Sequence, residues 1–259
     1  MVYREFNASP ELADVVACTW ERIVPTLGAS AAQRVVPDAC IDFVWCGERL
    51  EVAGPDTGAF MSPLIPGETV VGLRLRPGVA DSVLGLPASE LRDARVALED
   101  IWGQTGAELA ERLGRATSSF ERRRLLEAAV RARRPAMDEP DRLVLAAARL
   151  LGLPGSRVAL VSRAVATSER QLLRRLRAAV GYGPKTLDRV LRFQRFLSRA
   201  PAVARGDATL ARLAAELGYA DQAHLTREAV ALSGLTPGEL AASRATPAAA
   251  ARALEPPSR

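Results

Sequence analysis

The sequence predicts a chain of two parts, an α+β N-terminal half and an all-helical half built on a repeated two-helix unit. Up to about residue 103, short apolar runs are separated by Pro and Gly turns, a pattern typical of strands. After that point the apolar residues follow helical spacing. Between residues 158 and 237, moreover, one arrangement of apolar residues, tight turn and capped helix occurs twice.

The second copy of this repeat reads as two short helices broken by a tight turn. Apolar residues at i, i+3, i+4 and i+7 from Leu210 place one face of the first helix in a core. Gly218 follows where a helix commonly ends in a left-handed residue, and Asp221 is suited to cap the next helix. A short helix, a glycine turn and a helix with a polar outer face form a helix-turn-helix, whose second helix fits the major groove of DNA.

The first copy repeats the pattern from Val158, with Ala166 in the place of Gly218. The copies are offset by 52 residues before the turn and by 53 after it, so the second turn is one residue longer. Ser168 and Gln171 form a capping box, which predicts the start of the second helix of this unit.

Between the copies, Pro184 to Arg199 reads as one long helix with an apolar stripe. Such a helix would act as a rigid spacer. Two reading helices held about 34 Å apart would meet successive major grooves on one face of the duplex.

At this point the sequence resembles the AraC/XylS-type transcriptional regulators. The resemblance covers Arg157 to Ser243 and rests on SERQLLRRLRAAVGYGPKTLDRVLRFQR and LAAELGYADQAHLTREAVALSGLTP. The family usually has phenylalanine where Leu176 and Ala229 stand, and glycine where Ala166 stands. The resemblance implies an all-α DNA-binding domain in which a long helix joins two helix-turn-helix motifs. It also implies a sequence-specific, one-component transcription regulator that is not an enzyme.

The candidate base-reading residues are polar residues of the second helix of each unit: Arg170, Arg174, Gln222, His224 and Arg227. An arginine can donate two parallel hydrogen bonds to guanine, and a glutamine can pair with adenine. Lys185 and Arg189, near the start of the spacer helix, are candidates for contact with phosphates. For His224, capping or packing inside the motif is an equally weighted alternative.

Charge separates the two halves. Residues 1–140 carry 16 basic and 21 acidic side chains, whereas residues 141–244 carry 17 basic and 8 acidic ones. The basic excess therefore lies with the repeat, where it would supply salt-dependent attraction to phosphates. All but one of the basic residues are arginine, and the charge taken alone fits a solvated basic surface as well as it fits nucleic-acid binding.

The pattern predicts five segments: a β-rich α+β sensor-like domain over 1–103, a helical extension over 104–134, a linker over 135–140, the DNA-binding domain over 141–244 and a disordered tail over 245–259. The apolar stripe of the helical extension, at Leu109, Leu113, Leu126 and Val130, either packs on the chain's own core or forms a dimer seam.

Four strands are expected in the N-terminal domain: Val15–Val24, Gln33–Val36, Cys40–Cys46 and Thr69–Arg76. This domain is similar to a sensor-like domain found before such DNA-binding halves, through VVPDACIDFVW, GLRLRPG and LPASELRD. A third interpretation of the N-terminal part is a module for oligomerisation alone.

No catalytic set emerges, because the single histidine, His224, lies in a DNA-reading helix, and neither H-E-x-x-H nor G-x-S-x-G occurs. Neither a cofactor nor a metal site is expected, and three cysteines argue against a disulfide framework. The alternative from another class is a DNA-repair or alkyl-transfer protein with Cys40 as a reactive acceptor.

No run of 18 apolar residues and no signal-peptide core are present, so we expect a cytoplasmic protein that does not enter membranes. The partner that follows is double-stranded promoter DNA. RNA polymerase, a small-molecule effector and a second copy of the chain, forming a homodimer, are further candidates.

Overall fold

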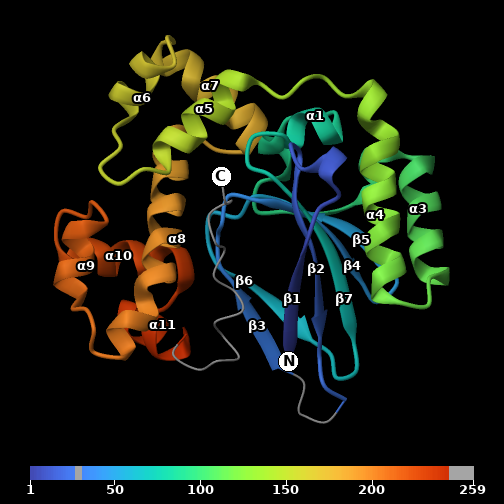
Figure 1. Cartoon of the computed structure of the whole chain (residues 1–259), viewed down its shortest axis with the longest axis horizontal. Helices are drawn as coiled ribbons and strands as arrows, with labels where there is room; N and C mark the ends of the chain where they lie inside the picture. The colour runs from blue at the N-terminus through green and yellow to red at the C-terminus, as the bar shows by residue number, and fades with distance from the viewer. Residues whose placement is uncertain (27–30, 245–259) are drawn as a thin grey trace.

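The structure, a computed structural model, describes residues 1–26 and 31–244 and contains a sheet-rich N-terminal part followed by a helical C-terminal part (Figure 1). The predicted fold class is therefore confirmed. The tail predicted at 245–259 lies outside the described residues. Within the described ranges, no helix is both long enough and apolar enough to span a bilayer.

The N-terminal part is organised by an antiparallel six-stranded sheet with the strand order β1-β2-β7-β4-β5-β8. Its strands are β1 (Val2–Asn7), β2 (Val16–Ile23), β7 (Thr69–Leu75), β4 (Ile41–Cys46), β5 (Arg49–Ala53) and β8 (Arg95–Ala97). A separate hairpin pairs β3 (Ala31–Val35) with β6 (Phe60–Leu64).

The two faces of the large sheet differ in chemistry because side chains alternate along each strand. On β4, Ile41, Phe43 and Trp45 point into the main apolar core of the N-terminal part. Asp42 and Val44, between them, point to the opposite face. This second face carries polar and charged groups and is turned toward the C-terminal helices.

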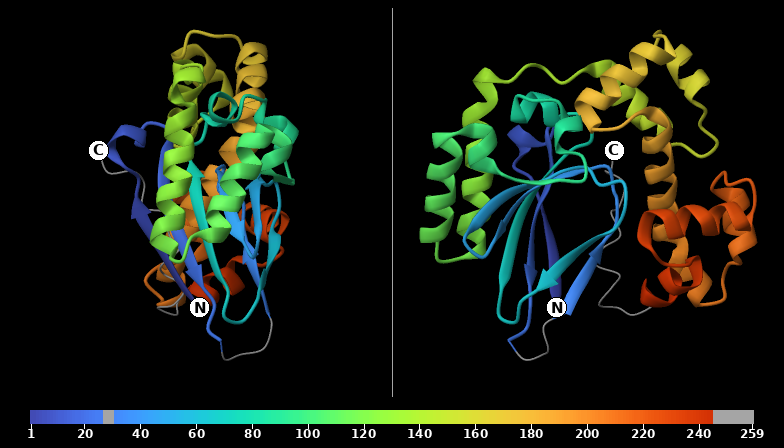
Figure 2. Two further views of the ribbon diagram at one scale, coloured as in Figure 1. Left: turned by 90° about the vertical axis from the view of Figure 1, so that its right-hand side faces the viewer. Right: turned by 180° about the vertical axis from the view of Figure 1, so that it is seen from behind.

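Short helices cover the top of the sheet, and two longer ones pack along one side of it (Figures 1 and 2). The short elements are η1 (Pro10–Leu12), α1 (Ala80–Leu84), η2 (Ala88–Leu91) and α2 (Leu98–Trp102). The longer helices are α3 (Gln104–Arg115) and α4 (Ser119–Arg133), followed by a turn, η3 (Arg134–Ala136).

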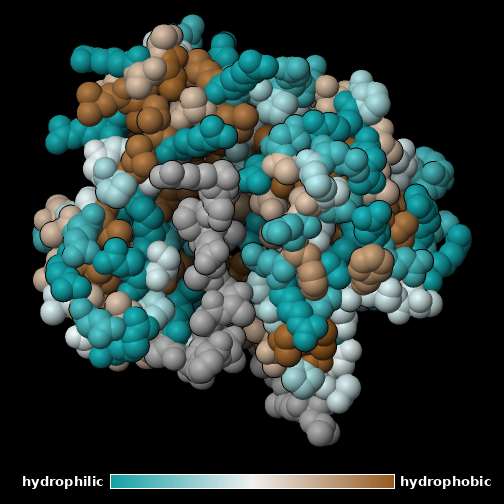
Figure 3. Space-filling view, in the orientation of Figure 1, coloured by the Kyte–Doolittle hydropathy of each residue, from teal (hydrophilic) through white to brown (hydrophobic). Residues whose placement is uncertain are grey.

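The apolar stripe of α3 and α4 is buried inside the chain. Leu109, Leu113, Leu126 and Val130 all belong to the core beneath the sheet. The outward surface over these helices is largely hydrophilic (Figure 3). The stripe therefore packs on the chain's own core, and the side chains suggested for a dimer seam are not available to a second copy.

The C-terminal part is helical throughout its regular structure. Its helices are α5 (Arg142–Leu151), α6 (Val158–Ala164), α7 (Glu169–Val180), α8 (Pro184–Ala204), α9 (Leu210–Glu216), α10 (Gln222–Ser233) and α11 (Pro237–Arg244). One apolar core holds them together, and α8 supplies Leu187, Val190, Phe193, Phe196 and Leu197 to it. The helix α8 lies on the side of the sheet opposite α3 and α4 (Figure 2).

The two parts are in close contact. Gly181, just after α7, has a φ of 92°, and a Cβ on it would come within 2.4 Å of Pro55 Cγ and 3.0 Å of the Ala88 carbonyl oxygen. Lower down, Arg34 of β3 donates to the carbonyl oxygen of Ser233 at 2.8 Å. The first helix-turn-helix unit and the second thus each meet the N-terminal part at a different place.

The expected strands were found within two residues at each end, but four others were missed. β1, β5, β6 and β8 were not predicted. β1 and β8 are the edge strands and alternate weakly, and β6 contains Pro63. β5 alternates, with Leu50 and Val52 buried, but it is only five residues long and follows closely on β4. The spacer helix runs to Ala204, five residues beyond Arg199, because Pro201 sits in its last turns without ending it.

Burial of Leu126 predicts that Leu126→Ala lowers the free energy of unfolding by about 2–5 kcal/mol, because the side chain is fully buried. Phe120→Ala, on the same helix but 65% exposed, should change it by less than about 0.5 kcal/mol. Urea denaturation measures both changes, and sedimentation measures the mass of the folded protein. A smaller mass with unaltered stability in Leu126→Ala would show that this stripe is a dimer seam after all.

Candidate nucleic-acid interface

The first helix-turn-helix unit consists of α6 and α7. Ser168 caps α7: its Oγ accepts from the Gln171 backbone N–H at 3.2 Å, while Gln171 Oε1 accepts from the Ser168 N–H at 3.5 Å. The predicted capping box is therefore confirmed. These two bonds satisfy backbone donors that have no partner within the helix and fix where α7 begins.

The two turns close in the same way, 52 residues apart. The Thr167 N–H donates to the Ser162 carbonyl at 2.9 Å, and the Tyr219 N–H donates to the Ala214 carbonyl at 2.9 Å. Gly218 has the left-handed φ of 81° that its position predicted, and Ala166 adopts the same region with a φ of 51°. Because a Cβ is strained in this region, Ala166 is held there by the turn that surrounds it.

The second unit consists of α9 and α10. Asp221 caps α10, and its Oδ1 accepts from the His224 backbone N–H at 2.6 Å. Gly218, Asp221 and the start of α10 thus lie as the sequence predicted. The extra residue of the second turn lies between the shared closure and this cap.

Both ring nitrogens of His224 and the ring itself contact residues of the same helix-turn-helix motif. Its Nδ1 accepts from the Ala220 N–H at 3.2 Å, so its Nε2 carries the proton that faces Glu228 Oε1 at 3.2 Å. The imidazole also packs edge-on against Tyr219, with 5.4 Å between ring centroids. In the free protein, His224 therefore braces the turn against α10, as the alternative interpretation of this residue expected.

A cluster of charged side chains holds α10 against α8. Arg192 of α8 donates to Glu228 at 2.9 Å and to Asp188 at 3.1 Å, and its guanidinium lies 4.9 Å from the centre of the Tyr219 ring. Arg189 reaches the same Glu228 at 3.3 Å. Glu228 is only 9% exposed, so this pairing fixes the helix more firmly than a surface ion pair would.

Sequence reasoning missed this cluster, in which Glu228 pairs with arginines 36 and 39 positions earlier in the chain. One clue was available: Glu228 follows His224 by four residues and lies on the apolar side of α10, where an unpaired carboxylate would be costly.

The remaining predicted residues are exposed and lack ion-pair partners within the described chain. They are Arg170, Arg174, Lys185, Gln222 and Arg227. Some other exposed arginines of this half are paired, such as Arg175 with Asp141 at 2.7 Å and Arg199 with Glu216 at 2.9 Å, whereas Arg163 and Arg177 form no ion pair among the described residues. The predicted set thus divides into five free side chains and two, Arg189 and His224, that are held by Glu228.

Two bihelical units with the same turn closure, joined by one helix and carrying free arginines on their second helices, define a helix-turn-helix DNA-binding protein. Residues 161–243 match a family model described as "Helix-turn-helix domain". The C-terminal part is an AraC-type helix-turn-helix domain, and the chain that contains it is a DNA-binding transcription regulator. Residues 4–97 match a model described as "Domain of unknown function". No curated protein matches the sequence.

Among solved structures, the chain is similar to ToxT from Vibrio cholerae. An apo form of ToxT is 12% identical over 86% of this chain and 96% of ToxT, with a TM-score of 0.43. A form of ToxT described as bound to an unsaturated fatty acid is 11% identical over 86% of this chain and 93% of that one, with a TM-score of 0.40.

The strained turn at Ala166 predicts that Ala166→Gly raises the free energy of unfolding by about 0.5–1 kcal/mol. Glycine removes the strain of the left-handed backbone but adds freedom to the unfolded chain, so the net gain is smaller than the strain. Ala164→Gly, two residues earlier in α6, should give no gain, because helical backbone favours alanine. Thermal and urea denaturation measure the difference, and equal effects of the two changes would contradict the prediction.

Proposed function

We propose that the protein is a one-component transcription regulator in which α7 and α10 enter two successive major grooves of promoter DNA. The N-terminal part then serves to sense a ligand and to pass its state to the DNA-binding part. We also propose that the protein works in the cytoplasm as a regulator and not as an enzyme. RNA polymerase and a second copy of the chain are its further proposed partners.

The length of α8 supports reading of two grooves. Its 21 residues span about 31 Å, close to the roughly 34 Å between successive major grooves on one face of B-form DNA. Both units pack on this helix through one apolar core. A spacer that is helical from end to end and packed along its length would hold α7 and α10 at a constant separation.

The observation that carries the proposal is the pairing state of the arginines. Arg170, Arg174 and Arg227 are exposed on α7 and α10 with no carboxylate partner among the described residues. An exposed arginine usually gains little from a surface pair, but one left free can meet guanine O6 and N7 or a phosphate at no cost in broken contacts. Gln222 stands free at the start of α10, in position to meet a base edge.

For Arg189 and His224 we propose a role in positioning α10. Direct contact with a phosphate or a base would require the His224 ring to give up one of its two bonds, whereas Arg189 meets Glu228 through Nε and keeps its terminal nitrogens. Removing one partner from a buried carboxylate costs more than a surface contact returns. Lys185, in contrast, is exposed at the first turn of α8 and needs no rearrangement to reach a phosphate.

Arg170→Ala and Arg227→Ala should each relax the choice of base at one position of the binding site. A good arginine–guanine pair contributes about 1–3 kcal/mol of discrimination, so preference at that position should fall by roughly tenfold or more. Lys185→Ala should instead weaken binding to all sequences alike and reduce the slope of affinity against salt by about one. Selection from random DNA, followed by titration at several salt concentrations, measures these effects.

Arg115→Ala is the matched control, because Arg115 is exposed on α3 and paired with Glu111 in the N-terminal part. It should leave affinity, base preference and salt slope unchanged. If Arg170→Ala and Arg227→Ala keep the base preference of the wild type, then the proposed reading helices are wrong.

The alternative of an alkyl-transfer protein finds no support in the state of the cysteines. Burial, together with the nearby Asp38 carboxylate, raises the pKa of Cys40 well above its usual range. Burial and a hydrogen bond to Glu68 raise the pKa of Cys46 to about 11. Because the thiolate is the nucleophile, neither cysteine is activated near neutral pH. Among the described residues, no cluster of His, Cys, Asp and Glu suitable for a metal ion is present.

Alkylation of the folded protein by iodoacetamide should accordingly be slow near neutral pH. Cys46 should react first as the pH is raised toward 11, since its thiolate forms only as the pH approaches its raised pKa. Peptide mass spectrometry identifies the modified residue, with the urea-unfolded protein as the control that reacts at all three cysteines. Rapid modification of Cys40 alone, or its alkylation by methylated DNA, would restore the enzyme alternative.

A further inference from the structure

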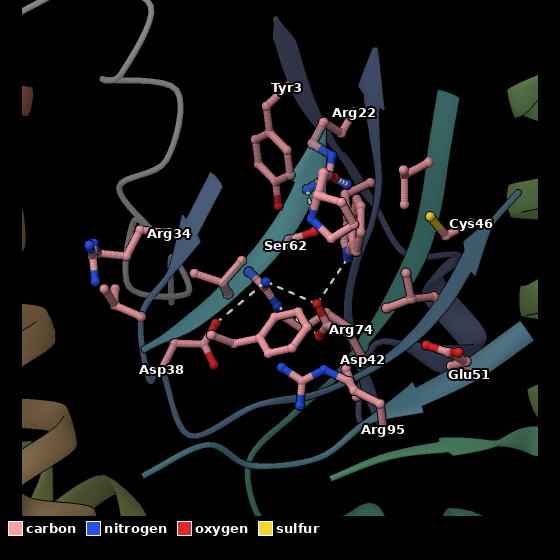
Figure 4. Close-up of a pocket in the computed structure, with 18 of the residues that line it drawn as sticks. Tyr3, Arg22, Arg34, Asp38, Asp42, Cys46, Glu51, Ser62, Arg74 and Arg95 are labelled. Atoms are coloured by element: carbon pink, nitrogen blue, oxygen red, sulfur yellow. Dashed lines mark hydrogen bonds and ion pairs between the residues drawn. The ribbon is translucent and has the colours of Figure 1, made fainter. Parts of the chain in front are cut away.

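A cavity of about 540 Å³ lies between the large sheet and the helices α8 and α11 (Figure 4). One wall is the polar face of the sheet, and β3 and β6 form a side. The other wall comes from the C-terminal part, through Gln194 of α8 and Leu240 and Arg244 of α11. Its volume suits a small organic molecule.

The wall on the sheet contains an apolar floor. Trp20 lies flat over Gly72, where an added Cβ would come within 2.2 Å of the indole, so glycine at this position is what lets the ring lie on the sheet. Tyr3 stands beside Trp20 with 5.9 Å between ring centroids. Val44 and Val70 complete a floor on which an apolar body can rest.

Several of the charges in the cavity are already neutralised. Arg74 forms a bidentate pair with Asp42, with both distances 3.0 Å, and also reaches Asp38 at 3.4 Å and Glu5 at 3.5 Å. Figure 4 shows this cluster at the centre of the cavity. Because three carboxylates already surround one guanidinium, Arg74 has no charge to offer a ligand.

Arg22, unlike Arg74, is not surrounded by carboxylates. It is 5% exposed, and its described hydrogen bonds go only to neutral acceptors: Gln33 Oε1 and Ser62 Oγ at 3.0 Å, and the Pro63 carbonyl at 3.4 Å. Within the described residues it forms no ion pair, and the nearest acidic influence, Glu68, instead accepts from the Cys46 thiol. Arg22 is thus a buried cation that forms no direct ion pair among the described residues, although the charge of the Glu68 carboxylate favours its protonated form.

Two buried donors at this place also lack acceptors. Arg22 Nε and Gln33 Nε2 have no hydrogen-bond partner in the described structure, although the two side chains are bonded to each other through Gln33 Oε1. Buried polar atoms are nearly always satisfied. The unsatisfied Nε of a buried guanidinium that forms no ion pair favours a ligand oxygen that carries negative charge.

Two further arginines line the cavity, Arg34 from β3 and Arg244 from α11 of the DNA-binding part. Arg34 donates to the Ser233 carbonyl and forms no ion pair within the described residues, and neither does Arg244. Both can add to the attraction of an anion.

We propose that this cavity binds a small organic carboxylate, with the carboxylate at Arg22 and an apolar body on the Trp20–Val44 floor. A single buried guanidinium matches one negative charge, and its free Nε edge is the side on which a planar carboxylate is usually held. The walls come from both parts of the chain, so such a ligand touches the sheet and α11 together. On the proposed function, occupancy and DNA affinity would then be linked and would change each other by the same factor.

Binding can be measured on the full-length protein by calorimetry, using probes that share one apolar body. Indole-3-acetate, tryptophol and tryptamine present a carboxylate, a hydroxyl and an ammonium group on the same ring system. A second set, 4-phenylbutyrate and 4-phenylbutanol, varies the body, and acetate and inorganic phosphate supply the anion alone. At least one of the two acids should bind roughly tenfold or more tightly than its alcohol, its amine and the simple anions.

Arg22→Gln should weaken the binding of that acid by about tenfold or more. Arg4→Gln is the matched control: Arg4 lies on β1 with its side chain 61% exposed and paired with Glu21, on the opposite face of the sheet, and its loss should leave affinity unchanged. Val44→Trp fills the floor without touching Arg22, and should abolish binding in a protein that circular dichroism shows to be folded.

The proposal is overturned if neither acid binds, if alcohol or amine binds as well as the acid, if phosphate alone binds as tightly, or if Arg22→Gln and Val44→Trp both bind like wild type. Calorimetry with acids requires no DNA, so a protein that binds the acid but no specific DNA would count against the proposed function and not against this site. Specific DNA binding with no acid bound would do the reverse.

Discussion

Both helix-turn-helix units pack against the helix α8, and this shared packing determines the arrangement of the C-terminal part. Val190, Phe193 and Phe196 are buried along one side of it, so both helix-turn-helix units share a single core instead of folding as separate modules. On its polar side, Arg192 and Arg189 hold Glu228 of α10. The placement of the second reading helix is therefore decided by a helix that lies outside its own motif.

Much of this half could be predicted because its determinants are local. The capping box at Ser168, the left-handed turn at Gly218 and the cap at Asp221 each depend on residues within a few positions of one another. A duplication strengthens such patterns, since two weak matches in the same order and at nearly the same offset rarely coincide by chance. The family model and the structure agree with these parts of the prediction.

The interior of the candidate sites could not be predicted, because it depends on contacts across long stretches of sequence. No residue close to Glu228 in the sequence identifies Arg192 as its partner. Likewise, Arg22 contacts Ser62 only because the β3–β6 hairpin folds over β2. Exposure of Arg170 and Arg227 was foreseeable from helical periodicity, whereas the engagement of His224 and Arg189 by one carboxylate was not. Weakly alternating edge strands such as β1 were missed for a related reason, since their pairing is set by neighbours already in place.

The close approach at Gly181 limits how this protein can be recombined with others. Pro55 and the Ala88 carbonyl fit against that glycine so tightly that any larger residue would push the halves apart. In a chimera that joins these reading helices to a foreign N-terminal half, the foreign half would need a surface that leaves the same space for the backbone at Gly181. Exchange of whole halves between regulators is thus constrained by a surface of a few atoms, at residues that do not line the cavity.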